Sequence, residues 1–127
     1  MRYEVRVIFG DTDQMGVVYY ANYLRFFEGA RSALWRSLGR SYKDVEAQGI
    51  ALPVVEAHVN YRKPARYEDL LEIDVEISEV RMASMRFTYT VWRGTDKIAD
   101  GYTRHGVIGS DGRPRAFPDT LRDMLEK

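Results

Sequence analysis

Two aspartates, Asp11 and Asp13, lie in the short segment GDTDQMG, between a stretch typical of a strand and one typical of a helix. A carboxylate held just before a helix N-terminus faces backbone N–H groups that lack helical partners and carry partial positive charge. Together they supply an acid–base group and a site for an oxyanion, the combination that suits attack on a carbonyl. Aspartates are also common in plain turns, where they accept hydrogen bonds from their own backbone. Both interpretations fit the spacing.

Most other kinds of catalytic site lack support. The chain has no cysteine, which excludes disulfides, thiolate metal ligands and a cysteine nucleophile. The two histidines, His58 and His105, lie far apart without cysteine partners, so a zinc site has little support. No GxSxG, GxGxxG or Walker motif is present. The loop with the two aspartates remains the leading candidate for chemistry.

The composition predicts one compact domain over residues 1–127. Its 45% hydrophobic and 13% aromatic content is typical of a globular fold. Lys+Arg and Asp+Glu are both 19, so no overall field attracts nucleic acid or an anionic membrane. No apolar run approaches the ~20 residues of a membrane span, and no signal-peptide core is recognisable. We therefore expect a cytoplasmic protein with no nucleic acid partner and no membrane span.

Apolar residues recur every three or four positions from Asn22 to Leu38, the spacing of one helix face. Asn22 is a candidate N-cap and Gly39 a candidate C′ residue, so both ends are marked. The pattern predicts one long helix directly behind the aspartate loop. The predicted buried stripe consists of Tyr23, Phe27, Ala30, Leu34 and Leu38, widened by Phe26 and Ala33.

Elsewhere, apolar and polar residues alternate, which is typical of strands with one buried face. The short connections between the last four strands favour antiparallel pairing, because parallel neighbours would need a crossover helix each time. The predicted fold is α+β, with one long central helix buried by a five-stranded antiparallel sheet. We expect strands over 2–9, 55–61, 71–77, 85–91 and 97–108, and short helices over 42–48 and near the C-terminus. The strand over 97–108 is weaker in pattern but is bounded by turn residues on both sides.

The run GDTDQMGVVYYANYLRFFEGAR resembles the D-x-D-x-x-G-[IV]-V-x-x-x-N-Y signature of hot-dog-fold acyl-CoA thioesterases of the 4-hydroxybenzoyl-CoA thioesterase family. It is most similar to the branch found beside bacterial Tol–Pal genes. YRKPARYEDLLEI and TRHGVIGSDGRPRAFP resemble two further family segments in the right order, so the resemblance covers nearly the whole chain. It implies a hot-dog fold, in which a curved sheet wraps a long helix. It also implies hydrolysis of an acyl-CoA to a carboxylic acid and free CoA, without metal or cofactor.

The resemblance implies roles for individual residues. Asp13 takes the catalytic carboxylate role, as nucleophile or as general base on water, and the backbone N–H of Tyr20 polarises the thioester carbonyl. Asp11 becomes a cap that fixes the loop, and Gly16 a backbone position that a side chain would obstruct. Relatives in the Tol–Pal branch commonly carry a histidine where this chain has Tyr20, so an imidazole proton donor is absent at that position.

Further residues are candidates for substrate binding. Tyr19 and Tyr23 are candidates to line an acyl pocket. Arg62, Lys63 and Arg66 form a small basic cluster that is a candidate to bind the phosphates of coenzyme A. Arg81 matches the basic position entering the next strand, where relatives contact the nucleotide of coenzyme A. Each basic residue also fits a simpler role as a solvated charge at a strand end.

The resemblance also implies a homodimer or homotetramer, in which sheets pair edge to edge and the loop of Asp13 faces the neighbour. The substrate is an acyl-CoA, and acyl carrier protein is a further candidate partner. A hot-dog dehydratase is disfavoured, because those enzymes use a histidine on the central helix and residues 22–38 contain none. A non-catalytic module that binds acyl-CoA or acyl carrier protein would keep the same pocket and the same acid, so this alternative stays open.

Overall fold

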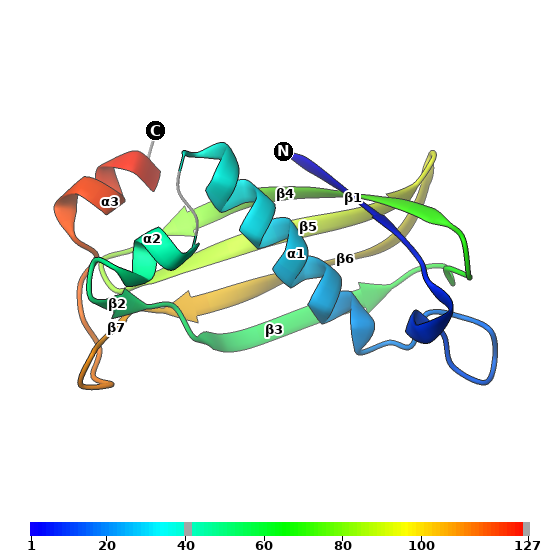
Figure 1. Cartoon of the computed structure of the whole chain (residues 1–127), viewed down its shortest axis with the longest axis horizontal. Helices are drawn as coiled ribbons and strands as arrows, with labels where there is room; N and C mark the ends of the chain where they lie inside the picture. The colour runs from blue at the N-terminus through cyan, green and yellow to red at the C-terminus, as the bar shows by residue number, and fades with distance from the viewer. Residues whose placement is uncertain (40–41, 126–127) are drawn as a thin grey trace.

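The computed structural model of the chain describes residues 1–39 and 42–125 (Figure 1). One long helix, α1 (Asn22–Ser37), lies across one face of a five-stranded sheet with strand order β1-β4-β5-β6-β3. All neighbouring strands are antiparallel, which confirms the predicted α+β arrangement. The strands are β1 (Arg2–Arg6), β3 (Val54–Tyr61), β4 (Leu70–Val80), β5 (Ser84–Arg93) and β6 (Asp96–Gly106).

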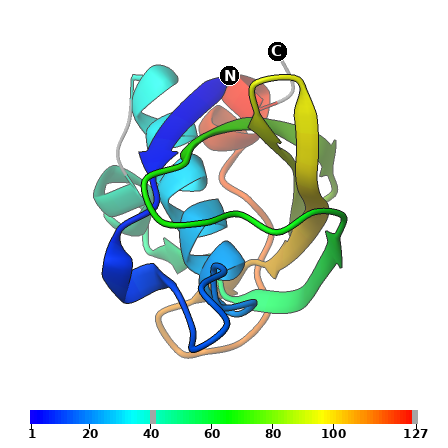
Figure 2. The ribbon, with the colours of Figure 1, turned by 90° about the vertical axis from the view of Figure 1, so that its right-hand side faces the viewer.

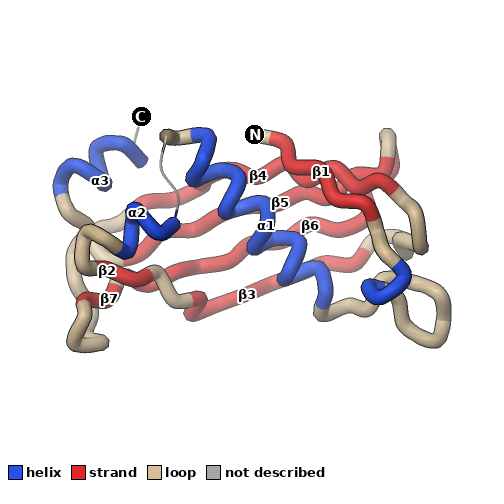
Figure 3. Tube along the Cα trace, in the orientation of Figure 1, coloured by secondary structure: helices blue, strands red, loops and turns tan. Residues whose placement is uncertain are grey.

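Shorter elements lie at the two ends of the sheet (Figure 3). The first strand was predicted over residues 2–9, but in the structure it ends at Arg6. Residues 9–11 form a short 3₁₀ helix instead, η1 (Phe9–Asp11). The last strand was predicted to reach residue 108, but it ends at Gly106. Ile108 belongs to a separate two-stranded sheet. Within residues 1–39 and 42–125, no helix has both the length and the apolar character needed to cross a membrane. The remaining elements are α2 (Tyr42–Glu46), β2 (Ile50–Ala51), β7 (Ile108–Gly109) and α3 (Asp119–Leu125).

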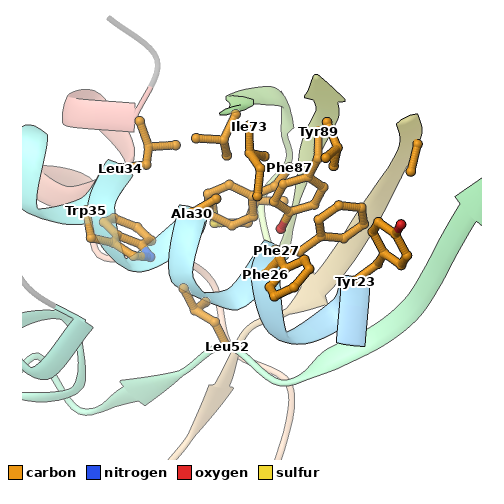
Figure 4. Packing of buried hydrophobic residues seen from close by; sticks show 14 of the residues in the cluster. Tyr23, Phe26, Phe27, Ala30, Leu34, Trp35, Leu52, Ile73, Phe87 and Tyr89 are labelled. Carbon is orange, nitrogen blue, oxygen red and sulfur yellow. The ribbon is translucent and has the colours of Figure 1, made fainter. Parts of the chain in front are cut away.

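The core lies between α1 and the inner face of the sheet, which curves around the helix (Figure 2). The ring of Phe27 stacks on that of Tyr89 from β5, with centroids 4.0 Å apart and planes 2° apart (Figure 4). Burial of the predicted helix stripe is confirmed except at Leu38, which is only half-buried. Alternate residues of β4 and β5 are buried in this core: Leu71, Ile73, Val75, Phe87, Tyr89 and Val91.

The two ends of α1 differ in how well they match the expectation. Gly39 has φ +82°, the left-handed conformation of a C′ glycine, as predicted. At the other end, the N-cap position is Ala21, with no side-chain cap, and Asn22 is the first helical residue. The predicted capping role of Asn22 is therefore wrong, because its side chain is bonded to the preceding loop instead.

Strand β3 forms as predicted but lies at the edge of the sheet. Its side chains are mostly exposed, including Val55 at 62% and Tyr61 at 51%. The alternating pattern is present, yet β3 contributes little to the core. Among its residues, Val59 is the one partly buried hydrophobic side chain that packs against the core cluster. An edge strand of this length with exposed apolar side chains has backbone groups free to pair with another strand.

Candidate active site

Residues 12–18 form a tight hairpin just before α1, at the end of the sheet where β3 finishes (Figure 1). The N–H of Asp13 donates to the Val17 carbonyl at 2.9 Å, and the N–H of Gly16 donates to the Asp13 carbonyl at 3.0 Å. Gly16 has φ +78°, which closes this turn and strains any residue with a Cβ. A Cβ there would meet only the Arg66 guanidinium, at 3.9 Å. Backbone conformation, and not obstruction within the chain, is what calls for glycine.

The two carboxylate oxygens of Asp13 have different environments. Oδ1 accepts the N–H groups of Met15, at 2.8 Å, and Val17, at 3.4 Å, as in a plain turn. Oδ2 accepts no hydrogen bond from the described residues, and the side chain is half-buried. Asp13 therefore holds the turn with one oxygen and presents the other to its surroundings.

Asp13 lines two cavities. One, of about 340 Å³, is mainly apolar in its walls and lies beside the end of β3. The other, of about 620 Å³, lies on the side of η1. The first is lined by Asp13, Val17, Val18, Tyr20, Tyr23, Tyr61, Arg62, Lys63 and Pro64.

Asp11 is turned away from both cavities. It is 2% exposed, and its Oδ2 accepts the N–H of Ile8 at 2.9 Å. Its Oδ1 forms an ion pair with Arg25 of α1. Because both oxygens are occupied, Asp11 holds the loop together, in agreement with the role that the resemblance implied.

Tyr20 lies beside Asp13 in the 340 Å³ cavity, at the uncapped start of α1. Its N–H donates to no acceptor in residues 1–39 and 42–125. Its carbonyl accepts the hydroxyl of Tyr61 at 3.0 Å, so β3 also holds this part of the chain. The structure thus brings to one cavity both Asp13 and Tyr20, a residue whose backbone N–H has no acceptor among the described residues.

Aromatic rings form the wall of this cavity. Tyr23 is 3% exposed, and burial raises its pKa to about 12, so the phenol stays protonated at neutral pH. The ring of Tyr61 packs against Tyr23 and Tyr20, with centroids 5.5 Å and 6.5 Å away. Tyr19 lines the other cavity, so the two predicted acyl-pocket residues lie on different sides of the loop. Tyr61 was missed by the sequence reasoning, although it begins the segment YRKPARYEDLLEI.

Arg62 and Lys63 line the 340 Å³ cavity, and each already has an acidic neighbour. Arg62 Nε donates to Asp100 at 3.0 Å, and Lys63 Nζ donates to Asp96 at 2.9 Å. Both basic side chains are more than half exposed, at 53% and 55%. Exposed ion pairs of this kind are weak, so either side chain can exchange its partner for a phosphate at small cost.

Arg81 lies elsewhere. It follows β4, in the turn before β5, and pairs with Glu79. The sheet register places this turn level with Val54, at the start of β3, whereas Arg62 follows the end of β3. Within one chain, Arg81 is therefore at the opposite end of the sheet from Asp13.

Comparison with known proteins gives the family. A model of the thioesterase-like superfamily matches residues 7–125, and the chain belongs to that family. It is 41% identical over 123 residues to the acyl-CoA thioester hydrolase YbgC of Escherichia coli O6:H1, covering 94% of this chain and 91% of that protein. It is 32% identical over 127 residues to the 1,4-dihydroxy-2-naphthoyl-CoA hydrolase of Thermosynechococcus vestitus, with 98% and 87% covered.

A solved structure agrees. The DHNA-CoA thioesterase from Staphylococcus aureus superposes with a TM-score of 0.90 at 29% identity, over 98% of this chain and 85% of that one. These likenesses confirm the hot-dog fold and the resemblance to hot-dog thioesterases that the three sequence segments indicated.

Proposed function

We propose that this protein is an acyl-CoA thioesterase that hydrolyses a thioester to a carboxylic acid and free coenzyme A. The observation that carries the proposal is that Asp13 and Tyr20 line one cavity of about 340 Å³. Among the described residues, Oδ2 of Asp13 accepts no hydrogen bond and the N–H of Tyr20 has no acceptor. The names of the relatives, a thioester hydrolase and a naphthoyl-CoA hydrolase, support the same reaction.

In the proposed reaction the thioester oxygen accepts a hydrogen bond from the Tyr20 N–H. This bond stabilises the negative charge that develops on the oxygen during attack. The positive end of the α1 dipole acts in the same direction. As a nucleophile, Asp13 forms an anhydride with the acyl group while the C–S bond breaks, and water then hydrolyses the anhydride. As a general base, Asp13 takes a proton from water while the water oxygen attacks the carbonyl carbon. The C–S bond then breaks, and the departing thiolate receives this proton to give free coenzyme A and the carboxylic acid. The reaction in either form requires no metal or further cofactor.

Thiol release from a panel of aryl, short, medium and long acyl-CoAs tests the proposal and defines the acyl group. We expect turnover of at least one of them. Binding of acyl-CoA or acyl carrier protein with no thiol release from any substrate would favour the non-catalytic module instead. Intact mass measurement during a single turnover then separates the two routes, because only the nucleophilic route gives an acyl adduct on Asp13.

Replacing Arg62 and Lys63 together with Ala is expected to raise the KM for acyl-CoA by roughly 3- to 10-fold, because each exposed cation is worth up to about 1 kcal/mol toward a phosphate. The KM for the matching acyl-pantetheine, which lacks the nucleotide, should change much less. Arg2→Ala is the control, since Arg2 is also an exposed arginine paired with an aspartate, Asp74. Equal rises for both substrates would show that the pair does not contact the nucleotide.

We also propose that the working unit is a homo-oligomer, at least a dimer, that pairs through the exposed edge of β3. Tyr61 at the end of this strand lines the candidate site, so a partner strand would border the same cavity. In this arrangement Arg81 contacts a bound nucleotide only from a second chain, because it lies at the far end of its own sheet.

Light scattering coupled to size exclusion should give at least about twice the chain mass of 14.8 kDa. Val55→Lys places a charge on the β3 edge and is expected to shift the mass toward the monomer. Met82→Lys is the matched control, because Met82 is similarly exposed, at 66%, but lies in the turn before β5. An active parent with a mass near 14.8 kDa would contradict the shared-site arrangement.

A further inference from the structure

Asn22 lies at the junction between the loop that carries Asp13 and the first turn of α1. Its backbone N–H donates to the Tyr19 carbonyl at 2.9 Å. Its side-chain Nδ2 donates to the Asp11 carbonyl at 2.8 Å. The side chain is half-buried and lines the 620 Å³ cavity together with Asp13. One residue is therefore bonded to the chain on both sides of the hairpin at 12–18.

The backbone bond controls the direction of the Tyr20 N–H. The Tyr19 carbonyl and the Tyr20 N–H belong to one planar trans peptide unit, so they point in opposite directions. Because Asn22 holds the carbonyl, it also orients the N–H at the other edge of the same unit. That N–H is the proposed donor to the thioester oxygen.

The side-chain bond controls the loop of Asp13. The Asp11 carbonyl accepts two donors, the N–H of Tyr19 at 2.9 Å and Nδ2 of Asn22 at 2.8 Å. This carbonyl lies two residues before Asp13, in a segment already fixed by the buried Asp11 side chain. Without the Asn22 amide, the Tyr19 N–H would be the one donor from residues 1–39 and 42–125 that still bonds to the Asp11 carbonyl.

The side chain of Asn22 does little for the helix itself. An N-cap asparagine accepts a hydrogen bond from the N–H two or three residues later, whereas this side chain donates backwards into the loop. The N-cap position, Ala21, has helical φ and ψ of −69° and −21° and no side-chain bond. The helix end is therefore left uncapped, and the asparagine amide is used to hold the loop.

We propose that Asn22 is a positioning residue for the proposed thioester hydrolysis, which fixes the Asp13 carboxylate relative to the Tyr20 N–H so that both act on one carbonyl. This inference rests on the proposed function. Reacting groups must approach to about 3 Å, and a displacement of about 1 Å lowers rates by up to about 100-fold. A residue that joins the two groups through its backbone and its side chain is placed to prevent such a displacement.

Asn22→Asp is the sharpest test. The substitution keeps the size of the side chain but places a carboxylate oxygen where the amide donates, against the Asp11 carbonyl. In the first turn of a helix, Asp is otherwise favourable because it interacts with the helix dipole. A role confined to the helix therefore predicts an unchanged or higher Tm and unchanged turnover. The positioning role predicts that kcat falls about 10- to 100-fold while KM stays within about threefold.

Asn22→Ala is the second variant, which removes the donor without adding a charge, and its kcat should fall less than that of Asn22→Asp. Ser37→Ala is the matched control at the other end of α1, where Ser37 Oγ donates to the Leu34 carbonyl at 2.6 Å. It should leave kcat unchanged.

Turnover of both Asn22 variants within about threefold of the parent, alongside an inactive Asp13→Asn, would overturn the positioning role and leave the proposed function standing. An equal fall of kcat in Ser37→Ala would also overturn it, because the loss would then come from a weakened helix. A parent that releases no thiol from any acyl-CoA would overturn the proposed function and this inference together.

Discussion

Replacing Asp13 with Asn is expected to lower kcat for acyl-CoA hydrolysis by at least about 100-fold. The amide oxygen can still accept the N–H groups of Met15 and Val17, so the turn is retained. The substitution replaces Oδ2 by an NH₂ group and removes the negative charge of the carboxylate. The amide can neither attack a carbonyl carbon nor take a proton from water. Binding of a non-hydrolysable acyl-CoA analogue, measured by calorimetry, should persist.

The control for this variant is Asp111→Asn. Asp111 Oδ1 also accepts a nearby N–H, that of Arg113 at 3.0 Å, in a turn outside the candidate site. The two substitutions change the same chemical group in similar turns, so a general loss of charge or of turn stability would affect both. Thiol release by Asp13→Asn within about threefold of the parent would rule out Asp13 as the reacting group.

Replacing Phe27 with Ala is expected to lower the free energy of unfolding by about 3–5 kcal/mol. The ring is 0% exposed and stacks on Tyr89, so its loss leaves a cavity between α1 and the sheet. The same contact supports a buried polar chain, in which the Tyr89 hydroxyl lies 2.6 Å from Thr103 Oγ1 and accepts a hydrogen bond from Arg31 at 3.1 Å. Urea unfolding followed by circular dichroism at one protein concentration gives the difference.

Phe9→Ala is the control for the core substitution. Phe9 is 77% exposed, so its truncation should change the free energy of unfolding by only about 0.5 kcal/mol. A loss below about 1 kcal/mol for Phe27→Ala would be incompatible with the close packing of α1 on β5.

Much of the fold follows from local spacing. The three-to-four-residue period predicts that the long helix ends at residue 38, and α1 ends at residue 37. Gly39 is the C′ glycine that follows the helix, as predicted. Alternation indicates β1, β3, β4 and β5, since residues two apart share a face whatever the rest of the chain does. Strand β6 is indicated mainly by the turn residues that bound it, and the short strands β2 and β7 were not predicted. The turn around Asp13 is also local, because the hydrogen bonds that Asp13 makes join residues at most four apart. The far end of the hairpin is not local, since the N–H of Val18 donates to the Ala65 carbonyl at 2.8 Å.

The prediction of the site was less complete, because its neighbours come from distant parts of the chain. Tyr61 reaches Tyr20 across 41 residues, and nothing in local spacing indicates that contact. Asn22 has the residue type and the position of an N-cap, yet its amide bonds to Asp11, because the hairpin folds back toward the helix start.

The remaining features that the sequence did not predict depend on strand order and register. The exposed side chains of β3 follow from its place at the sheet edge, and the separation of Arg81 from Arg62 follows from antiparallel register across four strands. A strand pattern states which residues share a face but not which strand lies beside it. Pairing depends on contacts between residues far apart in the chain, and only the folded sheet contains them.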